Sequence, residues 1–105
     1  MSWTENHETS YRITPRAKAD LVTIGIYTDS RWGKEQRNRY FRSLEKRFAW
    51  LVEHPRAGKH RDDIAEGYYS FPHGQHVVFY LIAGKEIHII GVLHQEMDVL
   101  VYFQG

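Results

Sequence analysis

The residues best suited to proton transfer are histidines, and the most informative of them is His94 in the stretch VLHQEMDV. It closes a strand-like run, two residues before Glu96 and four before Asp98. A histidine in this position could serve as a general base, as a metal ligand or as a locally hydrogen-bonded strand end. Because these roles belong to different classes of protein, the rest of the sequence has to decide among them.

Metal binding and small-molecule catalysis find little support in the residue spacing. His73 and His76 are three residues apart in a turn-to-strand setting, whereas a helical zinc pair is spaced i, i+4. His88 and His94 lie on one predicted strand, but six residues of strand span about 20 Å. The chain has no cysteine, no G-x-S-x-G elbow and no GxxxxGK phosphate loop. We therefore expect no metal site and no cofactor.

A second chemical feature is a dense set of basic residues in the predicted second helix and in the turn before it. Nucleic-acid binding is a weak interpretation, because Glu35 and Glu45 interrupt the set and the net charge is only +1. An acidic, amphipathic protein segment fits better, since its carboxylates would meet the basic side chains while its apolar side chains filled a groove. The residues predicted to bind such a partner are Arg31, Lys34, Arg37, Arg39, Arg42, Lys46 and Arg47.

Two helices are expected to carry these basic residues. A short strand, residues 11–13, is followed by Thr14-Pro15, a capping residue and a proline suited to the first helical position. This helix ends at Gly33. The second helix ends before Pro55, which disfavours helix in the residue that precedes it. Its apolar stripe comprises Phe41, Leu44, Phe48 and Leu51.

The remainder of the chain predicts a sheet. A polar loop over residues 55–67 precedes three strands, at 68–71, 76–82 and 86–93, joined by tight turns. The fold class is therefore α+β, with the order β-α-α-β-β-β and an antiparallel helical hairpin packed on an antiparallel sheet. The expected domain covers residues 11–99, between a disordered tail (1–10) and a C-terminal tail (100–105) whose YFQG resembles a tag remnant. The side chains most expected in the core are Trp32, Leu44, Phe48, Phe79 and Tyr80.

Composition limits the classes of protein further. A chain of 105 residues forms one domain, and neither a signal pattern nor an apolar run long enough to cross a bilayer is present, so a cytoplasmic protein without membrane contact is expected. Charge is uneven: the first 61 residues hold 13 Lys or Arg against 7 Asp or Glu, and Lys85 is the only cation after them. This asymmetry fits an acidic partner, although solvated helices are often basic.

Five motifs in order give the sequence a resemblance to a known family. They are YRITPRAKADL, YTDSRWG, HPRAGKHRDDI, SFPHGQHVVFYLI and VLHQEMDV. Together they resemble the ParE toxins of the RelE/ParE toxin–antitoxin superfamily from Tyr11 to about Val99. The resemblance implies a toxin that serves plasmid stabilisation, is blocked by a ParD-like antitoxin, inhibits DNA gyrase and does not bind DNA without the antitoxin.

RelE-like relatives on the same fold cut messenger RNA in the ribosome, so the fold alone does not choose the activity. The rival hypothesis is such an endoribonuclease, using Lys59, His60, Arg61 and His94. A third is a relative that binds antitoxin but has lost toxicity. RNA cleavage requires cations around the phosphate. This chain lacks the arginines that the family often carries where it has Tyr69, Gln75, Gly91 and Glu96. We therefore favour a protein that acts by binding, in which His94 hydrogen-bonds locally and Met97 packs on the sheet.

Overall fold

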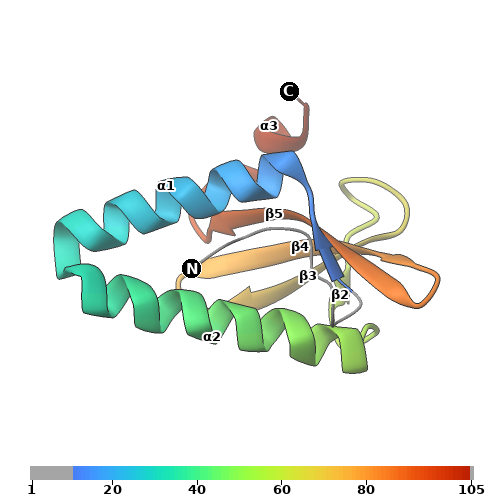
Figure 1. Cartoon of the computed structure of the whole chain (residues 1–105). Coiled ribbons are helices and arrows are strands. Elements are labelled where there is room, and N and C mark those ends of the chain that lie inside the picture. The colour runs from blue at the N-terminus through green and yellow to red at the C-terminus, as the bar shows by residue number, and fades with distance from the viewer. Residues whose placement is uncertain (1–10, 105) are drawn as a thin grey trace.

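The computed structural model describes residues 11–104, which form a five-stranded sheet with a helical hairpin along one face (Figure 1). The predicted N-terminal tail, residues 1–10, lies outside the described residues. In chain order the elements are β1 (Tyr11–Ile13), α1 (Pro15–Trp32), α2 (Lys34–Glu53), β2 (Lys59–His60), β3 (Tyr68–His73), β4 (His76–Ala83), β5 (Glu86–His94) and α3 (Val99–Gln104). None of the described helices is long and apolar enough to cross a membrane.

The hairpin begins and turns where the sequence predicts. The Thr14 hydroxyl accepts a hydrogen bond from the Ala17 N–H at 3.2 Å, and Pro15 occupies the first helical position. Gly33 has a φ of 93° and its N–H donates to the Asp29 carbonyl, so a single residue both ends α1 and starts α2. Only glycine adopts this backbone conformation readily, which makes the tight antiparallel hairpin dependent on it.

The sheet is mixed, in the order β1-β5-β4-β3-β2, with β4 at its centre. β1 pairs parallel with β5, whereas the other neighbouring strands are antiparallel. Two-residue turns, Gly74-Gln75 and Gly84-Lys85, join β3 to β4 and β4 to β5, each with a glycine at positive φ. The parallel pair thus brings the first described strand beside the last.

The main core lies between the hairpin and the sheet. Leu44, Phe48 and Leu51 of α2 are fully buried, as expected from their spacing. Tyr80 is buried on the same side; its hydroxyl donates to the Pro55 carbonyl at 2.8 Å and accepts from the Gly58 N–H at 3.0 Å. The fully buried Tyr80 hydroxyl is thus satisfied by the chain that follows α2.

The sheet's second face carries a smaller cluster that includes Phe79, which is fully buried. Adjacent residues of a strand point to opposite faces, so Phe79 points away from Tyr80 and the hairpin. The Phe103 ring of α3 packs on it with centroids 5.3 Å apart. Part of the segment predicted to be a C-terminal tail is therefore a helix in contact with the domain.

Four expectations differ from the structure. The sheet, predicted to be antiparallel, is mixed because β1 pairs parallel with β5. Trp32 was predicted in the core but is 63% exposed, because it is the last residue of α1 and projects beyond the sheet. Met97, predicted to pack on the sheet, is 51% exposed and borders a groove together with Val92 and His94 of β5. The predicted loop over residues 55–67 contains β2, which pairs with Ser70 and Tyr69 of β3.

Candidate partner-binding surface

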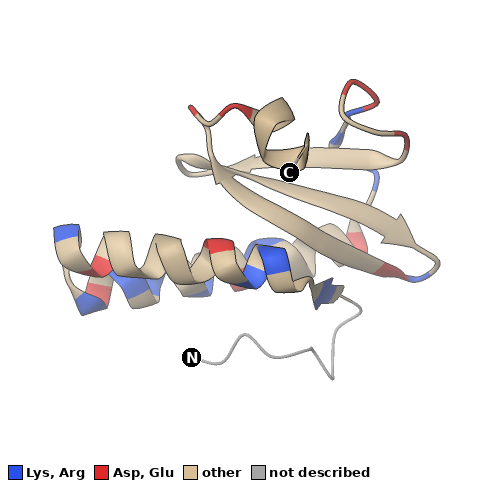
Figure 2. Cartoon of the chain, turned by 90° about the horizontal axis from the view of Figure 1, so that it is seen from above, with Lys and Arg blue, Asp and Glu red and all other residues tan. Residues whose placement is uncertain are grey.

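The outward side of α2 carries a basic stripe. Arg39, Arg42 and Lys46 follow one another at helical spacing and are exposed, while the residues that face the sheet are apolar. The one ion pair formed by these three within the described residues is Arg39 with Glu35, at 3.8 Å, and the Glu35 side chain is 93% exposed. Figure 2 shows the Lys and Arg positions concentrated along the hairpin. We call Arg39, Arg42 and Lys46 the basic stripe.

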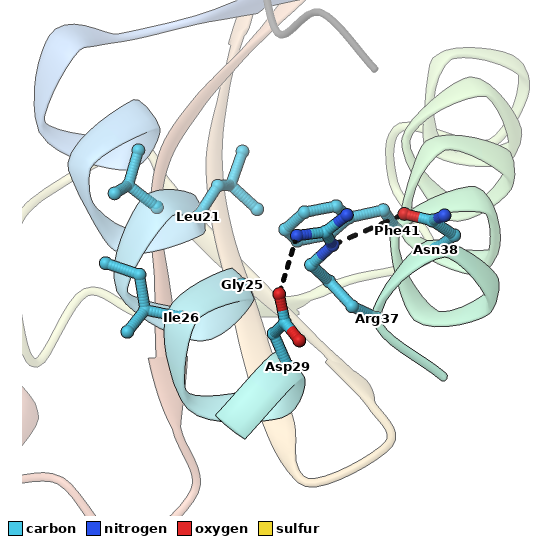
Figure 3. A pocket seen from close by; sticks show the side chains of 8 residues that line it. Leu21, Gly25, Ile26, Asp29, Arg37, Asn38 and Phe41 are labelled. Atoms are coloured by element: carbon cyan, nitrogen blue, oxygen red, sulfur yellow. Dashed lines mark hydrogen bonds and ion pairs between the residues drawn. The ribbon is translucent and has the colours of Figure 1, made fainter. Parts of the chain in front are cut away.

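Arg37 points away from this stripe into the groove between the helices (Figure 3). Its Nη1 donates to the Asp29 Oδ2 of α1 at 2.9 Å, and its Nε donates to Asn38 Oδ1 at 3.3 Å. Both members of the Arg37–Asp29 pair are about one-third exposed. The groove therefore holds a neutralised ion pair rather than an unpaired cation.

The same groove contains a hollow at Gly25. A Cβ built on Gly25 would lie 2.8 Å from the tip of the Phe41 ring, so the close approach of the two helices requires glycine here. Glycine within a helix lowers stability by about 1 kcal/mol relative to alanine. Helix–helix packing, and not helix propensity, therefore explains the glycine at this position. The hollow, of about 330 Å³, is lined by Leu21, Val22, Gly25, Ile26, Asp29, Arg37, Asn38 and Phe41.

Arg31 and Lys34 lie at the hairpin turn. The Arg31 guanidinium is 5.4 Å from the centre of the exposed Trp32 ring. Arg31 and Trp32 also border a second groove, of about 480 Å³, beside the β3–β4 turn. His76 and His94 lie on the far side of this groove.

Arg47 belongs to a third side of α2, which faces β3. Its guanidinium lies 4.9 Å from the centre of the Trp50 ring and 4.8 Å from that of Phe71, and its Nε donates to His73 Nδ1 at 3.4 Å. The seven predicted partner-binding residues thus divide into the basic stripe, the inter-helix groove, the hairpin turn and this aromatic seam. The structure brings three of them, and not all seven, onto one stripe.

A histidine network joins α2 to the β3–β4 turn. The Tyr40 hydroxyl lies 2.6 Å from His76 Nδ1, and burial raises the pKa of Tyr40 to about 12. Burial, followed by the nearby His94 and His73, lowers the pKa of His76 to about 4. His73 Nε2 lies 2.9 Å from the Ser43 hydroxyl, and burial together with Arg47 lowers the pKa of His73. His73 and His76, with their lowered pKa values, are neutral at pH 7, so they tie α2 to the sheet by hydrogen bonds rather than by charge.

Of the rival nuclease residues, Arg61 has a structural role in this conformation. It donates to both carboxylate oxygens of Asp63 at 3.0 Å and to the Ser70 hydroxyl at 3.4 Å, and it lies over the Phe79 ring. Its side chain is only 19% exposed, and its hydrogen bond to Asp63 lowers the pKa of that carboxyl. An arginine engaged in this way has little freedom to stabilise a phosphate.

His94 lies far from the other nuclease candidates. Lys59 and His60 form β2, at one edge of the sheet, whereas His94 ends β5, three strands away. His60 pairs with Tyr69, which pairs with Tyr80, and that residue faces Ile89, five residues before His94. Strand spacing and rise together place His60 and His94 roughly 20 Å apart. They do not converge on one reacting atom, as acid–base catalysis requires.

His94 instead has the local role expected from the sequence. Its Nδ1 accepts a hydrogen bond from the Glu96 N–H at 3.2 Å, and its ring meets that of His76 edge to face at 5.6 Å. Within residues 11–104, no three His, Cys, Asp or Glu side chains gather closely enough to hold a metal ion.

The sequence analysis assigned partner binding to basic residues and did not identify the uncharged exterior of α1. No residue from Leu21 to Thr28 is charged, although Val22, Ile26 and Tyr27 are 59%, 66% and 59% exposed. The core needs only one side of this helix. The sequence signal was the run LVTIGIYT, which is longer than two helical turns and too apolar for a helix with a solvated face.

Comparisons with known proteins agree with the resemblance. Residues 11–99 match the family described as "ParE toxin of type II toxin-antitoxin system, parDE". The chain is 43% identical to Toxin ParE1 of Caulobacter vibrioides, over 84% of this chain and 91% of that protein. It is 38% identical to Toxin ParE1 of Mycobacterium tuberculosis (85% and 92%) and 32% identical to Toxin ParE of Escherichia coli (88% and 90%).

A solved structure supports the fold independently. The chain is similar to one from "Chromosomal ParDE TA system from P. aeruginosa" with a TM-score of 0.69, over 85% of this chain and 98% of that one. Sequence identity is 21%, so this likeness concerns the fold: an N-terminal strand, two helices and a strand-rich mixed sheet.

Proposed function

The chain belongs to the ParE toxin family of type II toxin–antitoxin systems, and on that premise we propose that a ParD-like antitoxin neutralises it by binding the exterior of α2. We further propose that the free toxin inhibits DNA gyrase, in the cytoplasm, by binding rather than by catalysis.

The basic stripe is the observation that carries the antitoxin proposal. Arg39, Arg42 and Lys46 present three cations on one exposed side of a rigid helix. Their local carboxylates are few, since within the described residues only Glu35 pairs with the stripe. An antitoxin segment with carboxylates at helical or strand spacing would complement it and would be steered to it by charge.

Apolar contacts beside the stripe would complete the site. Trp50 is 36% exposed and packs on Phe71, with ring centroids 5.2 Å apart, and the Arg47 guanidinium lies within 5 Å of both ring centres. Aromatic and arginine side chains are the residue types in which binding energy concentrates at interfaces. We expect an apolar side chain of the antitoxin to cover this aromatic seam while its carboxylates meet the basic stripe.

Action by binding is favoured over RNA cleavage because His94 lies far from the other candidate catalytic residues and Arg61 is already paired. Arg61 is held by Asp63, and the β2 pair Lys59–His60 lies far along the sheet from His94. A ribosome-dependent nuclease would need these groups to converge on one phosphate.

The decisive experiment induces the toxin without antitoxin and measures two activities separately. We expect purified gyrase to lose supercoiling activity in the presence of the toxin, and translated messages to remain intact. Messages cut within the ribosome, with supercoiling unaffected, would replace the proposal with the nuclease. A protein that binds antitoxin but affects neither activity would overturn the gyrase target and leave antitoxin binding as the function.

A further inference from the structure

The groove at the hairpin turn is a surface that the proposed function does not use. It lies between that turn and the β3–β4 turn, has a volume of about 480 Å³, and is lined by residues of α1, α2, β5 and the β3–β4 turn. Trp32, the last residue of α1, borders it and is 63% exposed. Tryptophan is one of the residue types in which binding energy concentrates at interfaces, so an exposed tryptophan beside a hollow indicates contact with a partner.

The side of the groove formed by Tyr40 and the β3–β4 turn is held in place by hydrogen bonds. The Tyr40 hydroxyl donates to the His73 carbonyl at 3.1 Å and lies 2.6 Å from His76 Nδ1. A Cβ built on Gly74 would lie 2.9 Å from that hydroxyl, so the turn packs directly against the Tyr40 side chain. A partner side chain that enters the groove therefore needs little rearrangement of the toxin.

The groove has a cationic rim. Arg31 is the only Lys, Arg, Asp or Glu among the described residues that line it, and no carboxylate within residues 11–104 forms an ion pair with Arg31. Its guanidinium lies 5.4 Å from the centre of the Trp32 ring. Aromatic walls beside an unpaired cation favour a partner segment that carries an apolar side chain next to a carboxylate.

The groove adjoins the basic stripe. Arg39 of the stripe donates from Nη2 to Gln36 Oε1 at 2.8 Å, and Gln36 lines the groove. We propose that the acidic segment of the antitoxin anchors an apolar side chain, aromatic or long and aliphatic, in this groove and places a neighbouring carboxylate on Arg31. This inference rests on the proposed binding of the antitoxin to α2 and adds a second anchoring site to it.

Charge and continuity select the antitoxin as the occupant. A second copy of the chain would bring the cations Arg31 and Lys34 of two hairpin turns together, and like charges repel. A segment whose carboxylates meet the basic stripe already carries the charge that Arg31 attracts, and it reaches the groove without leaving α2. DNA gyrase is the other candidate, and its inhibition is measured separately.

Titration calorimetry of the antitoxin into the full toxin chain tests the proposal. Trp32→Ala should weaken binding by about tenfold or more, because the anchoring side chain loses an aromatic contact. The matched control is Leu100→Ala in α3, where the leucine is 53% exposed, and this variant should bind like the wild type. Circular dichroism and thermal unfolding check that both variants fold.

Thiol protection supplies a second, independent readout that leaves Trp32 in place. Because the chain contains no cysteine, Gln75→Cys at the groove and Leu100→Cys in α3 each introduce a single thiol. Bound antitoxin should slow the reaction of a maleimide with Gln75→Cys and leave its reaction with Leu100→Cys unchanged. Equal reaction rates of Gln75→Cys with and without antitoxin would overturn the proposal.

The charge-reversed variant Arg39→Glu, Arg42→Glu separates this proposal from the proposed function. If Trp32→Ala binds antitoxin as tightly as the wild type while the charge-reversed variant binds weakly, the groove is not an anchoring site and binding at the basic stripe stands. If both bind like the wild type, binding at the stripe is wrong as well. A loss of gyrase inhibition in Trp32→Ala, with unchanged antitoxin affinity, would assign the groove to gyrase instead.

Discussion

The two helices of the hairpin share one core and differ on their outer faces. Inside, Leu21 and Ile24 of α1 and Leu44 and Phe48 of α2 are buried against the same sheet. Outside, nine of the twenty residues of α2 are charged, whereas α1 has no charge between Asp20 and Asp29. The inner faces specify the fold, and the outer faces are free to specify partners. The two outer faces differ in charge: that of α2 is basic and that of α1 is uncharged.

The largest effect should come from breaking what the helices share. Phe48 is fully buried and its ring meets that of Tyr11 edge to face at 5.5 Å. We expect Phe48→Ala to lower the free energy of unfolding by about 3 to 5 kcal/mol, and antitoxin binding to weaken as the fold is lost. Urea unfolding measures the first and titration calorimetry the second. If the variant kept its stability, the core assignment would be wrong.

Reversing charge on α2 should affect one outer face alone. For the double variant Arg39→Glu, Arg42→Glu we expect the association rate with antitoxin to fall by about tenfold or more and its salt dependence to weaken, because the stripe steers an acidic partner. Kinetics at low and high ionic strength provide the measurement. Arg56→Glu with Lys85→Glu makes the same change in net charge elsewhere. An equal loss in that control would mean that net charge, and not the stripe, governs binding.

Acid should loosen α2 before α1. An unfolded histidine titrates near 6.5, whereas the pKa of His76 in the folded chain is lowered to about 4. Between these values the unfolded chain binds more protons, so the stabilisation is complete above about pH 6.5 and is lost as pH falls toward 4. Allowing for partial exposure, we expect a loss of about 1 to 2 kcal/mol.

Urea unfolding at several pH values checks this, and His76→Gln should reduce the pH dependence. Hydrogen exchange should show faster opening around Tyr40 in α2 than around Leu21 in α1, because only α2 is tied to the histidine network. An unchanged pH dependence in the variant would show that other groups control it.

The smallest effect concerns how the helices begin. Thr14 caps α1 with its hydroxyl, but Gly33 gives α2 no side-chain cap. We expect Thr14→Ala to destabilise the fold by about 1 kcal/mol, and Thr14→Ser to retain most of that stability. Thermal unfolding of the two variants provides the comparison. Equal stability of both would mean that the hydrogen bond to Ala17 contributes nothing.

Local sequence patterns predicted most of the fold because helical spacing, capping and tight turns depend on residues that are close together in the chain. Helical spacing located Leu44 and Phe48 in the core, and Gly33 predicted the hairpin turn. The features that were missed depend on other parts of the chain. β2 has two residues and no pattern of its own, and its place follows from β3. Trp32 was expected in the core, but it is the last residue of α1, at the hairpin turn, and is exposed there.

The sequence predicted which residues belong to the candidate site but not how they are arranged. The sequence identified the basic residues, yet helix phase separates Arg37 and Arg47 from the basic stripe, and their partners, Asp29 and His73, come from other elements. Gly25 gave no local sign of its role, since the need for it arises from the Phe41 ring of the neighbouring helix. Spacing along one helix cannot show what another helix places beside it.

The central claim is that the antitoxin binds the basic stripe of α2 and not the uncharged face of α1, and the antitoxin affinity of the Ile26→Asp variant tests it most directly. Titration calorimetry of the antitoxin into this variant and into Arg39→Glu, Arg42→Glu compares the two faces under one set of conditions. We predict that Ile26→Asp binds antitoxin within about twofold of the wild type, while the charge-reversed variant binds about tenfold or more weakly. An Ile26→Asp variant weakened as much as the charge-reversed one would contradict the claim.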